Sequence, residues 1–150
     1  MNKLIGNAAI NTLSGGAGND TLIGGSGNDL LSGGLGADVF RFDTALNVTN
    51  NVDSLMDFAS GEGDRIELEN AVFTKLSTLV EISPGHFELA AGLFVAEAGA
   101  TAHQSDDYIL YDTNTGNLYY DADGSGAGAA VQFATIIGHP AVSNTDFFVT

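Results

Sequence analysis

Cysteine and tryptophan are absent from this 150-residue chain, which also has only two prolines and four basic residues. The lack of cysteine excludes a disulfide framework and thiol chemistry. Nineteen acidic residues against four lysines and arginines give a formal charge of −15. Such a charge argues against nucleic acid and anionic membrane surfaces as partners, so cations are the natural partners of this chain.

Long apolar runs and catalytic motifs are missing as well. The longest nearly continuous apolar run, from Leu89 to Ala96, has eight residues and is too short to cross a bilayer, so we expect no membrane insertion. The start, MNKLIGNAAI, is unlike a cleavable secretory signal. The chain contains no H-E-x-x-H zinc motif, no G-x-S-x-G nucleophile elbow and no P-loop lysine. We therefore expect no enzymatic activity.

Glycine, by contrast, is abundant and periodic. From Gly15 to Arg41 the chain repeats one nine-residue unit three times without a gap, as GGAGNDTLI, GGSGNDLLS and GGLGADVFR. A degenerate fourth copy, GNAAINTLS, starts at Gly6 and carries Asn11 where the other copies carry aspartate. Three uninterrupted copies argue strongly against a flexible linker.

Each unit is predicted to be a turn followed by a short strand. Glycines at positions 1, 2 and 4 allow backbone conformations that let main-chain carbonyls converge on one point. The aspartate at position 6 adds a hard carboxylate oxygen, which favours calcium over softer transition metals. Positions 7 to 9 are typical of strands. The apolar position 8 predicts one stacked core column, formed by Leu13, Leu22, Leu31 and Phe40.

The pattern G-G-x-G-x-D-x-U-x, where U is a large apolar residue, resembles the calcium-binding nonapeptide of RTX proteins. Two later segments, 53–76 and 106–140, resemble the serralysin-like C-terminal modules of type I secreted proteins. The resemblance implies an all-β fold, with a parallel β-roll over residues 1–43 that continues into a β-rich cap over residues 44–150. We expect the two parts to form one continuous unit.

In that family two nonapeptides form one coil, and calcium ions lie between the turns of alternate repeats. The resemblance therefore pairs Asp20 with Asp38 on one edge of the roll and sets Asp29 against Asn11, a weaker neutral ligand, on the other. It implies carbonyl ligands from Gly15, Ala17, Gly34 and Gly36 at the first site, and from Gly25 and Gly27 at the second. The full predicted metal-site set is Asn11, Gly15, Ala17, Gly18, Asp20, Gly24, Gly25, Ser26, Gly27, Asp29, Gly34, Gly36, Asp38 and Asp57.

Two acidic groups outside the repeats have two interpretations each. Asp53 and Asp57 bracket a strand-like run and either complete a calcium site at the open end of the roll or serve as solvated or capping carboxylates. The run from Asp121 to Gly126 has the opening spacing of an EF-hand loop. Its twelfth position is Gln132, where a bidentate glutamate would be needed, so a polar turn is favoured.

In the cap, strand-prone runs at 108–111 and 118–120 flank the turn Thr113 to Gly116 and predict a hairpin, and 131–137 predicts a further strand. The last five residues, Asp146 to Thr150, place an acidic residue before apolar ones, which resembles the uncleaved signal of type I exported proteins. The alternative is a frayed or edge strand. We expect removal of these residues to reduce export through a type I transporter at only a modest cost in stability.

The sequence thus predicts a non-catalytic calcium-binding module that folds on calcium binding outside the cell. It would be secreted by a type I transporter and could follow an upstream catalytic or adhesin domain. The alternative is a small secreted adhesin or surface interaction protein that uses the calcium-loaded roll as a scaffold. Because the carboxylates of neighbouring turns would repel each other without a cation, folding of the repeats should depend on metal.

Overall fold

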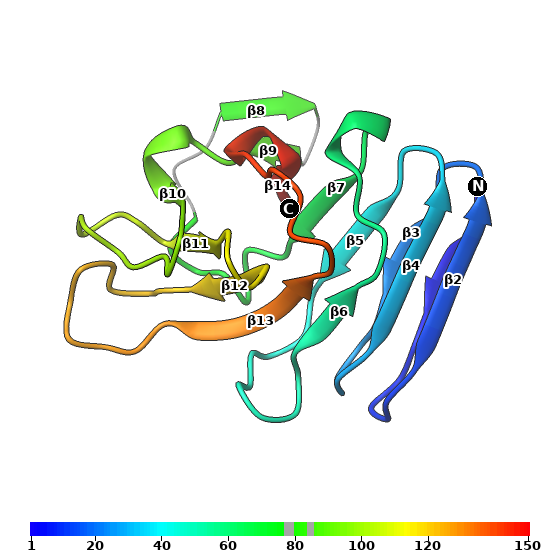
Figure 1. Ribbon diagram of the computed structural model, residues 1–150, viewed down its shortest axis with the longest axis horizontal. Coiled ribbons are helices and arrows are strands. Elements are labelled where there is room, and N and C mark those ends of the chain that lie inside the picture. The colour runs from blue at the N-terminus through cyan, green and yellow to red at the C-terminus, as the bar shows by residue number, and fades with distance from the viewer. Residues whose placement is uncertain (77–79, 84–85) are drawn as a thin grey trace.

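The structure is a computed structural model that describes residues 1–76, 80–83 and 86–150. Within these residues the strands form two seven-stranded sheets, and the only helices are three-residue 3-10 turns, so the all-β prediction is confirmed. Figure 1 shows the repeat strands at one end of the molecule and the cap at the other, with the N-terminus at the free end of the repeats. In this described part, no helix is long and apolar enough to span a membrane.

Each sheet has repeat strands at one end and cap strands at the other. In spatial order, the first sheet contains β1 (Lys3–Ile5), β3 (Thr21–Ile23), β5 (Val39–Phe42), β7 (Arg65–Leu68), β14 (Phe147–Val149), β9 (His86–Glu88) and β8 (Val80–Ser83). The second contains β10 (Phe94–Glu97), β11 (Ile109–Asp112), β12 (Asn117–Tyr120), β13 (Val131–Ile136), β6 (Asp53–Leu55), β4 (Leu30–Leu35) and β2 (Thr12–Ala17). The 3-10 turns are η1 (Ser60–Glu62), η2 (Ala91–Leu93) and η3 (Asn144–Asp146).

Successive nonapeptides go to opposite sheets, so that each strand pairs with the strand two repeats away. The register places Leu22 opposite Phe40 in one sheet and Leu13 opposite Leu31 in the other, and every pair from β1 to β7 and from β2 to β6 is parallel. The expected single apolar column is therefore wrong: position 8 forms two columns, one in each sheet. This separation follows from a coil of two repeats, because each coil contributes one strand to each sheet.

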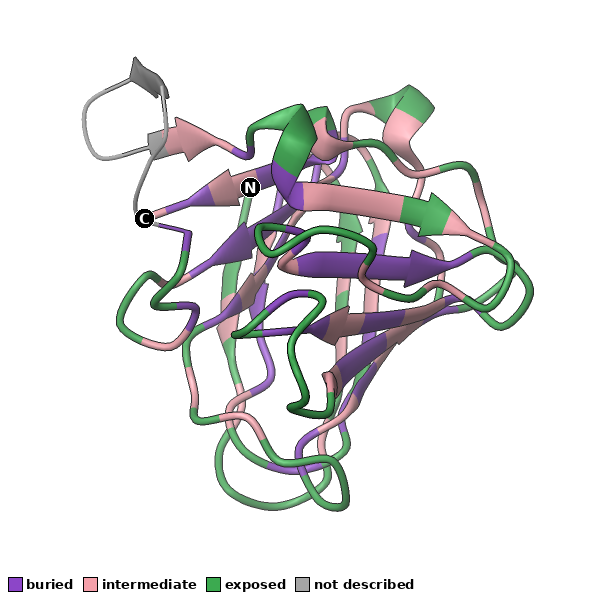
Figure 2. Cartoon of the chain, turned by 90° about the vertical axis from the view of Figure 1, so that its left-hand side faces the viewer, coloured by how far each residue is buried: buried purple, intermediate pink, exposed green. Residues whose placement is uncertain are grey.

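The core lies between the inner faces of the two sheets and runs without interruption from the roll into the cap. Leu22, Leu31 and Phe40 from the repeats are completely buried, as are Leu118 and Phe147 from the cap. Figure 2 shows the buried positions concentrated on the strands and the exposed positions on the connecting loops. Large aromatic side chains fill the cap, where Phe73 packs edge to face on Phe133 with ring centroids 5.2 Å apart.

The predicted hairpin and strand of the cap are confirmed. Strands β11 and β12 pair antiparallel around the turn at 113–116, and β13 extends the sheet on the other side of β12. Gly116 has a φ of 75° at the end of that turn, a conformation that glycine adopts without strain. Strand β13 then pairs parallel with β6, which joins the cap to the last coil of the roll.

The C-terminal residues form neither a frayed end nor an edge strand. Strand β14 lies inside the first sheet, parallel to β7 on one side and antiparallel to β9 on the other. Phe147 and Val149 are 0% and 1% exposed, and Asp146 caps the preceding turn through its hydrogen bonds to Ser143. These contacts do not support the expectation that removing residues 146–150 would cost only modest stability.

Candidate metal centre

The first edge of the roll is a ladder of aspartates spaced by one coil. The Asp20 amide donates to Asp38 Oδ1 at 2.7 Å, and the Asp38 amide donates to Asp64 Oδ1 at 2.9 Å. At the free end, the amide of Asn2 donates to Asp20 Oδ1. Asn2 therefore takes the place of the preceding aspartate, and β1 is the strand of a further, incomplete nonapeptide.

The second edge repeats this arrangement with Asn11, Asp29 and Asp53. The Asn11 amide donates to Asp29 Oδ1 at 2.7 Å, and the Asp29 amide donates to Asp53 Oδ1 at 3.0 Å. The ladder thus places the carboxylate of Asp53 in the position that the repeat aspartates hold. Asp29 has a neighbour on either side: the predicted neutral one, Asn11, and a charged one, Asp53.

One oxygen of each repeat aspartate lacks a partner. The residues Asp20, Asp29 and Asp38 are at most 1% exposed, and the Oδ2 atom of each is buried and has no hydrogen-bond partner among the described residues. A buried carboxylate oxygen without a partner carries a desolvation cost of about 1–3 kcal/mol or more. Three such atoms in equivalent positions of a repeat indicate oxygens arranged to contact a cation.

Carboxylate and carbonyl oxygens of different coils converge on these positions. A Cβ atom built on Gly15 would lie 2.8 Å from Asp20 Oδ2 and 2.6 Å from the carbonyl oxygen of Gly33. On the other edge, a Cβ on Gly24 would lie 2.4 Å from Asp29 Oδ2 and 3.0 Å from Asp53 Oδ2. A side chain at either glycine would overlap these oxygens. Glycine is therefore required at position 1 for the oxygens to lie this close together.

The glycines at positions 2 and 4 have a separate role in the turns. In all three complete repeats both lie in the left-handed region, with φ between 94° and 127°, where non-glycine residues are strained. They reverse the chain tightly enough to bring the carbonyls of the turn toward the aspartate. Two predicted metal-site residues lie between these glycines, Ala17 at the end of β2 and Ser26 in the turn after β3.

A cation at these positions must take most of its ligands from the backbone. Among the described residues, no group of three or more histidine, cysteine, aspartate or glutamate side chains is placed to hold a metal ion. Each inter-coil position instead combines two acidic or amide side chains with turn carbonyls. An all-oxygen set of this kind suits the flexible coordination of calcium, and the residues present therefore fit that ion.

Burial changes the acidity of three ladder members, Asp29, Asp53 and Asp64. Burial raises the pKa of Asp29, against the lowering effect of the Asn11 amide. Burial, with a smaller contribution from the neighbouring charge of Asp29, raises the pKa of Asp53 to about 7 against the lowering effect of the Asp29 amide. Burial likewise raises the pKa of Asp64. In the metal-free protein these carboxylates are held in surroundings that disfavour their charge.

We expect pH to act in opposite directions on metal-free stability and on calcium affinity. Because the folded-state pKa of Asp53 is about 7 against an ordinary value of 3.8, its contribution to metal-free stability is fully present below pH 3.8 and is lost as pH rises through 7. Calcium must displace this proton, so its dissociation constant should rise below pH 7, by up to about tenfold per pH unit for one proton. Melting in chelator and calcium titration from pH 5 to 8 measure the two effects.

The matched variant for that experiment is Asp53→Asn, which should remove most of the pH dependence between 6 and 8 and weaken calcium binding at pH 8. Equal calcium midpoints at pH 6 and pH 8 in the unaltered protein would contradict a role for Asp53 as a ligand.

Asp57 occupies a different place from the ladder aspartates. Its two oxygens accept hydrogen bonds from the Ser32 hydroxyl at 2.6 Å and from the Gly33 and Gly34 amides at 2.9 and 3.1 Å. The contacts favour the capping alternative for Asp57, whereas Asp53 has the ligand-like position. Asp64 and Asn2 were missed by the sequence prediction. Their signal is the partial unit D-x-U-x, which reads DRIE at Asp64 and, with asparagine, NKLI at Asn2.

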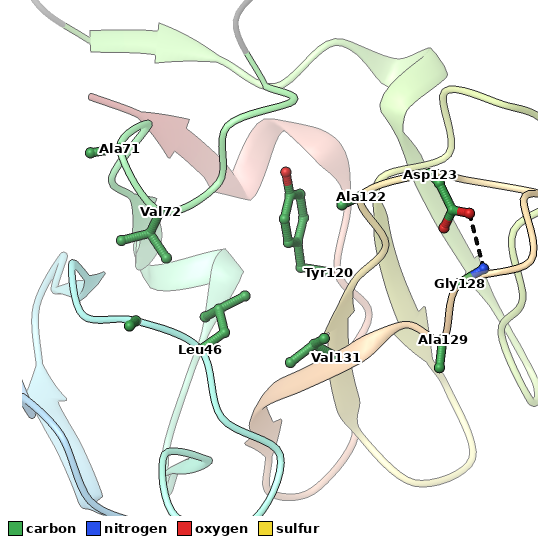
Figure 3. A pocket seen from close by; sticks show the side chains of 10 residues that line it. Leu46, Ala71, Val72, Tyr120, Ala122, Asp123, Gly128, Ala129 and Val131 are labelled. Atoms are coloured by element: carbon green, nitrogen blue, oxygen red, sulfur yellow. Dashed lines mark hydrogen bonds between the residues drawn. The ribbon is translucent and has the colours of Figure 1, made fainter.

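The EF-hand-like run forms a turn closed on itself. Asp121 Oδ1 accepts the Asp123 amide at 3.3 Å, and Asp123 Oδ2 accepts the Gly128 amide at 2.9 Å. This turn borders an apolar pocket of about 580 Å³ in the cap, lined by small side chains together with Leu46, Val72 and Tyr120. Figure 3 shows Asp123 and Gly128 at one end of the pocket and Leu46 and Val72 at the other. These contacts agree with the polar-turn interpretation.

Mutations on the two edges of the roll should differ in how far they raise the calcium concentration at the folding midpoint. We expect Asp38→Ala to raise the calcium concentration at the folding midpoint by roughly tenfold or more, since it removes a buried carboxylate. Asn11→Ala should raise the midpoint less, because it removes a neutral amide at the end of a ladder, and Asn11→Asp should lower it. Circular dichroism during a calcium titration measures each midpoint. Equal effects of Asp38→Ala and Asn11→Ala would contradict this register.

Comparisons with known proteins agree with this geometry. Residues 5–40 match the family model described as the RTX calcium-binding nonapeptide repeat, in four copies. The fold is similar to the solution structure of the AlgE6R3 subunit from the Azotobacter vinelandii mannuronan C5-epimerase, with a TM-score of 0.51 and 26% sequence identity. The alignment covers 97% of this chain and 76% of that one. No curated protein matches this chain. RTX nonapeptide repeats bind calcium, and residues 5–40 of this chain carry four copies of that repeat.

Proposed function

We propose that this chain is a non-catalytic RTX module that folds when it binds calcium outside the cell and carries a type I secretion signal at its C-terminus. The observation that carries the calcium part is the buried, unpartnered Oδ2 atom on Asp20, Asp29 and Asp38. A bound cation would provide the missing partner of these carboxylate oxygens, and a chain with a formal charge of −15 attracts cations.

The ladders support two well-equipped calcium sites. At the first, Asp20 and Asp38 would act with carbonyls of their two turns; the predicted donors are Gly15, Ala17, Gly34 and Gly36. At the second, Asp29 would act with Asp53 and with carbonyls of the turn 24–27. Asn2 and Asn11 would leave the outermost positions weaker, because each replaces a carboxylate by a neutral amide.

Calcium would neutralise the carboxylate charges of these turns. The ligands that the chain provides set the affinity, and therefore the calcium concentration at which binding occurs. Extracellular calcium modules of this kind have affinities of about 10⁻⁴ to 10⁻³ M, which excludes binding at cytosolic concentrations. At one hundred times the dissociation constant each site would stabilise the fold by about 2.7 kcal/mol. Two sites therefore contribute an amount comparable with the total stability of a small domain.

Export by a type I transporter and attachment to a larger protein are two further parts of the proposed function. RTX repeats are typical of secreted extracellular proteins, and the segment Asp146 to Thr150 resembles a type I signal. The chain would thus pass a type I transporter before its cap folds, and its repeats would fold in external calcium. The similar solved chain is a subunit of an epimerase. That precedent supports the proposal that this chain serves a larger protein, with an upstream catalytic or adhesin domain.

Export can be tested separately from folding. Deletion of residues 146–150 should strongly reduce the amount of chain that a type I transporter delivers to the medium, measured against the cell pellet. The matched control is Leu118→Ala, which removes a completely buried side chain far from the C-terminus in sequence. This variant is destabilised but keeps the signal, so it should still be exported. If the deletion were secreted as well as the unaltered chain, the signal would lie elsewhere.

A further inference from the structure

Four polar side chains form a connected group on β12 and β13 of the cap, two neighbouring strands in Figure 1. The register places Asn117 opposite Thr135 and Tyr119 opposite Gln132. The Thr135 hydroxyl donates to Asn117 Oδ1 at 2.9 Å, and Asn117 Nδ2 donates to the Tyr119 hydroxyl at 3.1 Å. Gln132 Nε2 completes the group by donating to the Thr135 hydroxyl at 3.1 Å. All four residues are half-buried, and these bonds fix their orientations.

A β-bulge brings the group onto one face of the sheet. Side chains three residues apart in a regular strand point to opposite faces, yet Gln132 and Thr135 bond to each other. The pairing of β12 with β13 shifts register here, so that both Phe133 and Ala134 are buried in the core. Leu118, between the two β12 members, is also completely buried, which puts the group on the outer face. Bulges are over-represented next to functional sites, where they redirect side chains in this way.

A pocket of about 280 Å³ adjoins this group. It is lined from β11, from the adjacent ends of β12 and β13 and from two loops, by residues that include Leu110, Asp121, Ala130, Thr101 and Ser125. Asp121 lies two residues beyond Tyr119, on the same face of the sheet. The two loops are tied together, because the Ser125 amide donates to the Gln104 carbonyl at 2.9 Å. The pocket therefore has fixed walls.

The group and the pocket form one continuous strip, which we call the β12–β13 strip: Asn117, Tyr119, Asp121, Gln132 and Thr135. From Asn117 to Asp121 it extends over about 13 Å, long enough for a short oligosaccharide. Its amide and hydroxyl groups both donate and accept hydrogen bonds, as sugar hydroxyls do. The Tyr119 side chain, inclined along the strand toward Asn117, adds a ring on which the apolar C–H face of a sugar can stack.

Charge selects among the sugars that this strip could bind. None of its five residues is basic, and the chain has a formal charge of −15, so sugars that carry carboxylate or sulfate groups are repelled. Asp121, which is 5% exposed, is its one acidic residue and can accept a hydrogen bond from a neutral hydroxyl. The chemistry of the strip therefore matches an uncharged sugar chain.

We propose that the β12–β13 strip and the adjoining pocket are a binding site for a neutral oligosaccharide. This inference goes beyond the proposed function, because it uses residues of the cap and none of the calcium ligands. It gives the cap a binding role of its own, in addition to closing the roll and carrying the C-terminal segment. The site is formed before a ligand binds, which lowers the entropic cost of binding.

The first experiment titrates the full chain in saturating calcium with cellohexaose, xylohexaose, mannohexaose and maltohexaose, by calorimetry and by NMR of the backbone amides. We expect saturable binding of at least one of them, with a dissociation constant of about 1 mM or lower. The shifted amides should be those of the strip and of the pocket. The matched control is hexamannuronate, which differs from mannohexaose by its carboxylates and should bind at least about tenfold more weakly than the best neutral sugar.

Three results of this titration would overturn the proposal. The first is no binding of any neutral hexasaccharide at millimolar concentration. The second is tighter binding of hexamannuronate, which would show that the site is built for acidic sugars. The third is binding whose amide shifts lie outside the strip and the pocket.

The second experiment tests the named side chains. Tyr119→Ala and Gln132→Ala should each weaken binding by about tenfold, since they remove the stacking surface and an amide that bonds to sugar hydroxyls. Tyr119→Phe keeps the ring and should weaken binding less than Tyr119→Ala does. Thr74→Ala, at an exposed cap residue away from the strip, is the control and should bind normally.

Melting of each variant in calcium separates a loss of binding from a loss of folding. Gln132→Ala and Tyr119→Phe should stay folded at the temperature of the titration, so they test the site even if Tyr119→Ala does not fold. Unchanged affinity in folded Gln132→Ala together with unchanged affinity in Tyr119→Ala or Tyr119→Phe would overturn the assignment of the site to this strip.

Discussion

Excess chelator is expected to unfold the outer coils of the roll while the cap stays folded. The strands β1 to β4 are short, and buried carboxylates follow one another along each edge of the roll, Asp20 and Asp38 on one and Asp29 and Asp53 on the other. Without a cation these charges repel each other, and the glycine-rich turns lose much backbone entropy on folding. Beyond Asp64, the described residues of the cap contain no such ladder, and they keep a core of large aromatic side chains.

Far-ultraviolet circular dichroism and NMR together measure this effect. Chelation should remove the β signal of residues 2–35, and added calcium should restore it. Magnesium at the same concentration is the matched control, and it should not restore the signal because it requires near-ideal octahedral geometry and gives up its water reluctantly. A spectrum unchanged by chelator would remove the central claim of calcium-dependent folding.

Deletion of the last five residues should prevent stable folding even at saturating calcium. Strand β14 lies between β7 and β9, so its loss would expose the inner edges of two strands and open the core. Phe147 is completely buried and packs on Phe94 with ring centroids 5.3 Å apart. Phe147→Ala alone should cost about 3–5 kcal/mol, a large part of the 5–15 kcal/mol typical of a domain.

Thermal melting in calcium provides the measurement, and the adjacent aromatic residue provides the control. Phe148 is half-buried on the opposite face of β14, where the Arg65 guanidinium lies 5.8 Å from its ring centroid. Phe148→Ala should therefore cost less, on the order of 1–2 kcal/mol. Similar losses for the two alanine variants would show that β14 does not contribute to the core as its burial indicates.

Folding and export would compete for this same segment if it is the secretion signal. A strand with Phe147 and Val149 in the core cannot be read by a transporter while the protein is folded. Since the cap is expected to stay folded without calcium, a transporter would have to engage the segment before the cap folds. Deletion of residues 146–150 should therefore have two separable effects, one on secretion before folding and one on stability after folding.

The sequence predicted the turns of the roll because each turn is a local structure. Glycines at positions 1, 2 and 4 and aspartate at position 6 are needed wherever a turn must gather oxygens, so the pattern repeats visibly along the chain. The opposition of Asp20 to Asp38, expected from the family resemblance, matches the hydrogen-bond ladder. The cap hairpin was predictable for the same reason, since its turn residues lie between two strand-prone runs.

The aspartates that accept the Asp29 and Asp38 amides, at the cap end of the roll, could not be predicted from the nine-residue period. The step from Asp29 to Asp53 is 24 residues and the step from Asp38 to Asp64 is 26, whereas the step inside the repeats is 18. The intervening loops do not keep the nonapeptide spacing of glycines, so only the sheet pairing of β4 with β6 and of β5 with β7 brings these aspartates into the ladders.

Sequence alone determined which segment binds calcium and by what chemistry, because turn conformation and ligand type are properties of a few consecutive residues. Tertiary structure decided where the roll ends, that Asn51 and Asp57 hold its last turns, and that the C-terminus is a central strand. Each of these depends on residues far apart in the chain that pack only after the two sheets have formed. The terminal run from Phe147 to Val149 is compatible with an exposed signal and with a buried strand, and its burial follows from the gap between β7 and β9 that it fills.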